Sequence, residues 1–132
     1  MRSGTVLACC GLLLGLLPGC GGSSALPPVE GHVYYRGAPV AGGTLVFTPD
    51  PERGGRGNCA VAVIQPDGRY RLRTGNEPGA APGWHRITVA AAAVEGRPPV
   101  QPLPSKYCDP LRSDRWCEVK AGQANVIDIH LD

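Results

Sequence analysis

The chain has 132 residues, of which 42% are hydrophobic, 5% aromatic and 18% charged, and its formal net charge is +2. The 19 glycines and 14 prolines make up a quarter of the sequence, and with one Phe and two Trp they exclude a large helical core. The weak positive charge gives no electrostatic reason to expect a nucleic-acid partner. These values indicate one small, loop-rich, secreted β-domain.

The first 19 residues are typical of a signal peptide. Arg2 supplies a positive charge, and residues 6–17 form an apolar stretch of small or aliphatic residues that includes two cysteines. This stretch is too short to span a hydrocarbon core of about 30 Å. We therefore predict that residues 1–19 direct export of the chain and are then removed.

The apolar stretch ends in Leu17-Pro18-Gly19-Cys20. A small residue before a cysteine, after an apolar run, resembles the lipobox of bacterial lipoproteins. The resemblance implies that Cys20 becomes the N-terminus and carries acyl chains such as palmitate, and two or more chains hold a protein firmly to a bilayer. The alternative is an ordinary signal peptide that leaves Cys20 as a plain thiol. Residues 20–28 read as a short flexible tether, and residues 29–132 as the domain.

From residue 29 onward the hydrophobic pattern alternates with period two and is broken by Gly, Pro or Asp-Gly. Residues 59–65 are apolar on both faces, which is typical of a buried central strand. Asp67-Gly68 predicts a tight hairpin, and residues 97–110 predict a proline-rich crossover at a sheet edge. The pattern predicts seven short strands, at residues 29–35, 44–48, 59–65, 69–73, 84–91, 116–119 and 125–131.

Strands of this length, joined mostly by short turns, favour an all-β fold in which seven antiparallel strands pack as a β-sandwich around one core. A barrel is the alternative. Most of the domain's glycines and prolines fall between the predicted strands, so we expect a folded chain rather than a disordered one.

Four motifs, in this order, carry a resemblance to a known family. They are Val29-x-Gly31-x-Val33, the run from Gly37-x-Pro39 to Leu45-x-Phe47-x-Pro49, Asp67-Gly68-x-Tyr70-x-Leu72, and Pro82-Gly83-x-His85-x-Ile87-x-Val89. Their order and spacing resemble the carboxypeptidase regulatory-like domain, which has the transthyretin-like (prealbumin-like) β-sandwich fold. The tail from Pro104 to Gly122 looks like that of small bacterial lipoproteins that carry such a domain alone.

The resemblance implies a module without catalytic residues or a cofactor, located at the cell envelope. Two positions depart from the family pattern: His85 stands where an aromatic residue is usual, and Arg115 where an apolar residue is expected. The hydroxyisourate hydrolases are enzymes of the same fold, but this chain ends in His130-Leu131-Asp132 and lacks their Tyr-Arg-Gly-Ser ending. A transthyretin-like hydrolase is therefore only the remote alternative.

The three histidines lie on different predicted strands, with His32 and His130 facing outward and His85 facing inward. We do not expect them to converge, and no short His or Cys spacing indicates a metal site. We expect His85 to be a core residue with a hydrogen-bond partner.

Three cysteines, Cys59, Cys108 and Cys117, remain in the domain. In an oxidising envelope we favour a disulfide between Cys108 and Cys117, which flank an irregular segment, with Cys59 as a buried free thiol. The alternative is that all three are small core residues.

Arg69, Arg71 and Arg73 form a basic row on one face of a predicted strand. Arg86 and Trp84 share outward parity on another strand and could extend this surface. One interpretation is a solvated face. The other is a contact surface for acidic polysaccharide or phospholipid headgroups, with Trp84 stacking on a sugar or a partner.

Together these patterns predict a non-enzymatic lipoprotein, anchored in the cell membrane or outer membrane, that binds or scaffolds an envelope protein or polysaccharide. A carbohydrate-binding accessory protein of the envelope is the alternative, and a flat aromatic platform would distinguish it. No metal, cofactor or nucleic-acid partner is expected.

Overall fold

The computed structural model describes residues 25–93, 96–97, 99 and 101–132. The predicted signal peptide, Cys20 and residues 20–24 of the predicted tether lie outside the described residues. The described chain is all-β, with two sheets that contain five and six strands. Two short 3₁₀ helices, η1 (Pro51–Arg53) and η2 (Ser105–Cys108), lie in the connections.

The five-stranded sheet is built around β1. In this sheet β2 and β5 pair with β1 antiparallel, whereas β10 and β11 pair with it parallel. Its strands are β1 (Val29–Tyr35), β2 (Ala38–Pro39), β5 (Arg69–Arg71), β10 (Asn125–Val126) and β11 (Ile129–Leu131).

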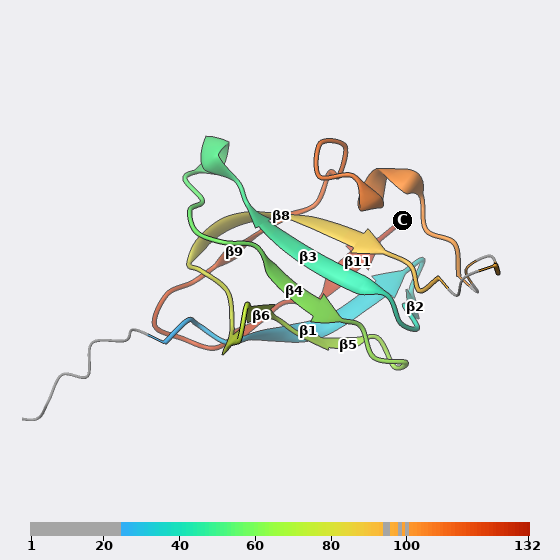
Figure 1. The fold of residues 1–132 in the computed structure, drawn as a ribbon, viewed down its shortest axis with the longest axis horizontal. Helices are drawn as coiled ribbons and strands as arrows, with labels where there is room; N and C mark the ends of the chain where they lie inside the picture. The colour runs from blue at the N-terminus through green and yellow to red at the C-terminus, as the bar shows by residue number, and fades with distance from the viewer. Residues whose placement is uncertain (1–24, 94–95, 98, 100) are drawn as a thin grey trace, which may run out of the picture.

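The six-stranded sheet has the order β7-β6-β4-β3-β8-β9, and its pairs are antiparallel. In Figure 1, β3 and β4 lie in front of β1 and β11, so the two sheets form two layers. Its strands are β3 (Thr44–Pro49), β4 (Ala60–Val63), β6 (Arg73–Thr74), β7 (Glu77–Pro78), β8 (Gly83–Ala90) and β9 (Trp116–Val119).

A strand lies at each of the seven predicted positions, but the predicted number is too low. The described residues form eleven strands, because two predicted strands are each split in two and two short ones, β2 and β7, are added. The prediction of a wholly antiparallel arrangement is also wrong, since β1 runs parallel to β10 and β11. Short turns fix the pairing of neighbours in sequence, but they do not fix how the first strand meets the last.

Buried side chains from both sheets form a single core, which gives the domain its sandwich-like character. Phe47, from the six-stranded sheet, is fully buried, and its ring centroid lies 6.3 Å from that of Tyr70 in the other sheet. The alternation predicts one inward face for each strand. On β1, β3, β5 and β8 this face is buried at Val33, Leu45, Phe47, Tyr70, His85, Ile87 and Val89, whereas Tyr35 is only partly buried against the core.

The split in the last predicted strand occurs where the chain passes over Gly31. A Cβ atom at Gly31 would collide with the carbonyl group of Ile127, so β1 needs a residue without a side chain here. The same carbonyl accepts a hydrogen bond from the hydroxyl of Tyr70, whose pKa is raised mainly by burial. The crossing therefore ties β1, β5 and the link between β10 and β11 together.

The end of the predicted tether lies against the domain. Pro27 is buried, and its carbonyl accepts a hydrogen bond from the amide of Ala80 at 3.2 Å. The carbonyl of Pro28 accepts another from the amide of Asn125 at 2.8 Å. Residues 27–28, at the end of the predicted tether, are thus held by the domain.

Candidate functional site

The described surface contains a groove beside the hairpin that joins β4 to β5. We call it the arginine groove; its volume is about 650 Å³. One wall consists of Val61 and Val63 on β4, which are 43% and 69% exposed, so the prediction that residues 59–65 are buried on both faces is wrong. The lining residues are Val61, Ala62, Val63, Gln65, Arg69, Tyr70, Arg71, Arg73 and Gly75.

The groove forms where a strand changes sheets. The hairpin closes with a hydrogen bond from the amide of Gln65 to the carbonyl of Arg69 at 2.8 Å, and further along Val61 pairs with Arg73. Between these two points, however, β5 leaves β4 and Arg71 pairs with Glu30 of the other sheet. Figure 1 shows β5 diverging from β4 beyond the hairpin. This divergence explains why the predicted strand at residues 69–73 is split in two.

The arginine groove carries positive charge with little internal compensation. Arg69, Arg71 and Arg73 line it, and no carboxylate is among the lining residues. Arg71 forms an exposed ion pair with Glu30 at 3.1 Å, and Arg73 donates a hydrogen bond to the carbonyl of Asn76 at 2.7 Å. Within the described part of the chain, Arg69 has no ion-pair partner. Three exposed guanidinium groups beside apolar side chains are suited to an anion attached to an apolar body.

Trp84 and Arg86 lie apart from the arginine groove, because β3 separates β8 from β4. They belong to a second cluster, the tryptophan–arginine stack, made of Arg53, Trp84, Arg86 and Trp116. The guanidinium carbon of Arg53 lies 4.4 Å from the centre of the Trp116 ring and 5.7 Å from that of Trp84, and Arg86 lies 5.0 Å from Trp116. The predicted surface of three arginines extended by Trp84 and Arg86 is therefore two surfaces.

Asp50, which is buried, organises the tryptophan–arginine stack. Its carboxylate accepts a hydrogen bond from the indole nitrogen of Trp116 at 3.0 Å and lies 3.6 Å from Nε of Arg53. The same carboxylate accepts the amide of Glu52 at 3.1 Å, which caps η1. The contacts within the stack are thus satisfied by the protein itself, and the indole faces are partly covered by arginine.

The histidines are arranged as the alternation predicts. His85 is fully buried, and its Nε2 lies 2.7 Å from the carbonyl of Ala81. On the outer face of the five-stranded sheet, the ring of Tyr34 is stacked between His32 and His130, at centroid distances of 6.0 and 5.1 Å. Among the described residues, no group of three His, Cys, Asp or Glu side chains is arranged to hold a metal ion.

All three cysteines of the described domain are free, so the predicted Cys108–Cys117 disulfide is not formed. The two thiols have different surroundings: Cys108 donates a weak hydrogen bond to the carbonyl of Val89 at 3.3 Å, while Cys117 packs against the core. Burial raises the pKa of Cys117 to about 12, which keeps it a thiol at neutral pH. Cys59 is exposed, contrary to the prediction that it is buried.

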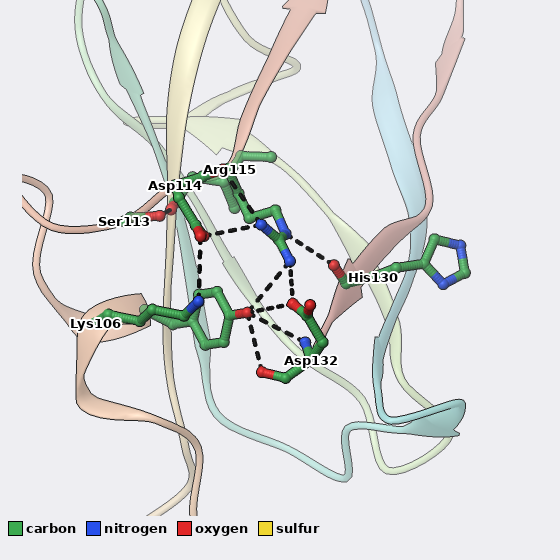
Figure 2. A network of polar contacts seen from close by, with 8 residues as sticks. Lys106, Ser113, Asp114, Arg115, His130 and Asp132 are labelled. Atoms are coloured by element: carbon green, nitrogen blue, oxygen red, sulfur yellow. Dashed lines mark hydrogen bonds and ion pairs between the residues drawn. The ribbon is translucent and has the colours of Figure 1, made fainter.

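A polar network that the sequence analysis did not identify fastens the C-terminal end. Figure 2 shows Arg115 between the carboxylates of Asp114 and Asp132 and beside the main-chain oxygen of His130. The hydroxyl of the buried Tyr107 donates to Asp132 Oδ1 at 2.8 Å and accepts from the Asp132 amide at 3.1 Å. The only hint of this network in the sequence was Arg115, a charged residue at a position where the family pattern has an apolar one.

Electrostatics in this network favour the charged forms. The hydrogen bond from Tyr107, assisted by Arg115, lowers the pKa of the Asp132 side chain. Lys106 donates a hydrogen bond to Asp114 at 3.1 Å, which lowers the pKa of Asp114 and raises that of Lys106. Each charged side chain of this network has a partner within it, so we assign the network a structural role in holding β11 and Asp132 against η2.

No family model, curated protein or solved structure matches this chain. Within the described residues no helix has the length and apolar character needed to cross a bilayer.

Proposed function

We propose that this chain is an exported bacterial lipoprotein, anchored through a lipidated Cys20, whose β-domain is a non-enzymatic binding or scaffolding module of the cell envelope. The proposal starts from the apolar run of residues 6–17 and the Gly19-Cys20 pair that ends it. A segment of this kind directs export, and acyl chains on Cys20 would hold the domain at a membrane. The anchored state places a small folded module at the surface of a bilayer.

The finer fold that we propose is the transthyretin-like β-sandwich of the carboxypeptidase regulatory-like domain. Support comes from the order of the motifs and from two sheets that share one core. Two of the motif glycines have a physical reason. A side chain at Gly31 would collide with the carbonyl of Ile127, and Gly68 has a φ of 87°, which glycine adopts without strain.

The arginine groove is the single observation that carries the binding role. It is a concave surface of about 650 Å³ that combines three arginines with exposed valines. Apolar side chains exposed beside a cluster of arginines, of which only Arg71 has a carboxylate partner, mark a place for a partner. The proposed partner is anionic and partly apolar, and it is held without covalent chemistry.

The alternative, a carbohydrate-binding accessory protein, requires flat aromatic faces open to solvent. In the tryptophan–arginine stack, Arg53 lies over both Trp84 and Trp116. On the other sheet, the ring of Tyr34 is stacked between two histidines. Neither arrangement offers an uncovered platform, which favours the anion-binding module.

Inhibition of lipoprotein signal peptidase tests the anchor. We expect globomycin to leave the precursor uncleaved, and Cys20→Ser to abolish both palmitate incorporation and recovery of the chain with membranes, because Cys20 is the proposed acylation site. The measurements are gel mobility, radiolabelled palmitate and membrane fractionation of whole cells. Cys59→Ser is the matched control, since Cys59 is an exposed thiol of the folded domain, and it should leave all three unchanged. Palmitate retained by Cys20→Ser would contradict the anchor.

A further inference from the structure

The arginine groove begins beside the point where the N-terminal segment is held. A smaller pocket of about 300 Å³ lies there, and its lining includes Pro28, Pro78 and Arg71. Arg71 lines both this pocket and the arginine groove. Residues 27–28, which are held by the domain, therefore lie next to the Arg71 end of the groove.

The length of chain between Cys20 and the described domain limits how far the domain can stand from a membrane. Only residues 20–24 separate the proposed lipid attachment from Ala25. Five fully extended residues span at most about 17 Å. Pro27 is held to the domain by its hydrogen bond with Ala80, so residues 25–26 can extend this distance only slightly. An anchored domain must consequently keep the Arg71 end of the groove near the lipid surface, where the effective concentration of headgroups is high.

The chemistry of the groove matches that surface. Guanidinium groups bind phosphate oxygens with paired hydrogen bonds, and a cluster of basic side chains is attracted to anionic lipids. No acidic side chain lines the groove, and the one carboxylate paired with a groove arginine, that of Glu30 with Arg71, is exposed. Val61 and Val63 are exposed in the same groove, where they can contact the apolar boundary below the headgroups.

We propose that the arginine groove binds the phosphate headgroups of anionic phospholipids in the membrane that holds Cys20, so that the domain lies with this groove against the bilayer. The closeness of the groove to the membrane rests on the proposed lipid anchor, whereas the charge and shape of the groove do not. Arg69, Arg71 and Arg73 make the contacts with phosphate. The module is then attached at two points, through its lipid and through its groove.

Vesicle co-sedimentation of the unlipidated mature chain tests the groove separately from the anchor. The protein is residues 20–132 with Cys20→Ser, which retains every described residue. We expect it to sediment with vesicles of equal parts phosphatidylglycerol and phosphatidylcholine, and not with phosphatidylcholine alone. Raising the salt concentration should release it, because the contacts are ionic.

Variants identify the groove as the binding surface. Arg69→Gln, Arg71→Gln and Arg73→Gln combined should weaken vesicle binding by about tenfold or more. Arg56→Gln, Arg97→Gln and Arg112→Gln combined remove the same charge from exposed positions outside the groove and should change binding by less than about twofold. Lysine at positions 69, 71 and 73 should restore most of the binding. Circular dichroism of each variant confirms that it is folded.

Several results would overturn the proposal. Equal binding to both kinds of vesicle would show that anionic lipid is not the ligand. Equal losses of binding in the two triple variants would show that net charge, and not the groove, attracts the protein to the vesicles. Retention on an acidic polysaccharide without vesicle binding would assign the groove to a polymer instead. If the Cys20→Ser protein does not bind anionic vesicles while the wild-type chain carries palmitate in cells, the groove proposal alone is refuted. If the Cys20→Ser protein binds the vesicles while the wild-type chain carries no palmitate in cells, the anchor alone is refuted.

Discussion

Phe47→Ala is expected to lower the free energy of unfolding by about 3–5 kcal/mol, a large part of the stability of so small a domain. Phe47 is fully buried on β3 and lies between Tyr70 of the other sheet and His85 of β8, at centroid distances of 6.3 and 5.8 Å. Removing the ring leaves a cavity between the two layers that neither sheet can fill by moving alone.

Urea unfolding followed by circular dichroism measures this effect. Val63→Ala is the matched control, because Val63 lies on the neighbouring strand of the same sheet but is 69% exposed. It should change the free energy of unfolding by less than about 1 kcal/mol. Similar losses for the two variants would show that the sheets do not share one core at Phe47.

Gly31→Ala is expected to destabilise the domain by about 3 kcal/mol or more, at the upper end of the range for overpacking. The added Cβ would overlap the carbonyl of Ile127, which is main chain and cannot rotate away. Relief requires the link between β10 and β11 to move off β1, which also disturbs the hydrogen bond from Tyr70 to this carbonyl.

Gly122→Ala separates this collision from ordinary backbone strain. Gly122 has a φ of 74° and open space around it, so alanine there should cost only about 1–2 kcal/mol. Thermal and urea unfolding of the two variants compare the two costs. A Gly31→Ala domain as stable as the wild type would mean that Ile127 does not cross β1 as described.

Alternation along the chain was sufficient to place the strands and most of the core. The inward positions that the alternation predicts on β1, β3, β5 and β8 are buried except at Tyr35, which is partly buried, because a strand in a two-layer fold must present its apolar side chains to one face. The alternation also placed His85 in the core, although a polar side chain does not by itself indicate burial. Local pattern therefore fixed both the class of the fold and the parity of its strands.

The features that create the arginine groove depend on contacts between distant segments. No local signal at residues 69–73 indicates that Arg71 pairs with Glu30 while Arg73 pairs with Val61. The same switch exposes Val61 and Val63, which an apolar run alone assigned to the interior. Likewise, Trp84 and the three arginines share outward parity, but parity does not say that β3 lies between them.

The cysteines and the C-terminal network show the same limit. Proximity in sequence favoured a Cys108–Cys117 disulfide, yet η2 directs Cys108 toward Val89 while Cys117 packs against the core. Arg115 broke the expected apolar pattern because it pairs with Asp132, which is 17 residues away along the chain. A charged residue at an expected core position is thus a useful sign of a long-range ion pair.

Mass spectrometry of the N-terminal peptide from the membrane-extracted protein tests the central claim most directly. The account predicts that the chain begins at Cys20 and that this peptide carries the added mass of acyl chains. A peptide that still contains residues 1–19, or one that begins at or near Cys20 without lipid, would contradict the account of a lipid-anchored envelope module.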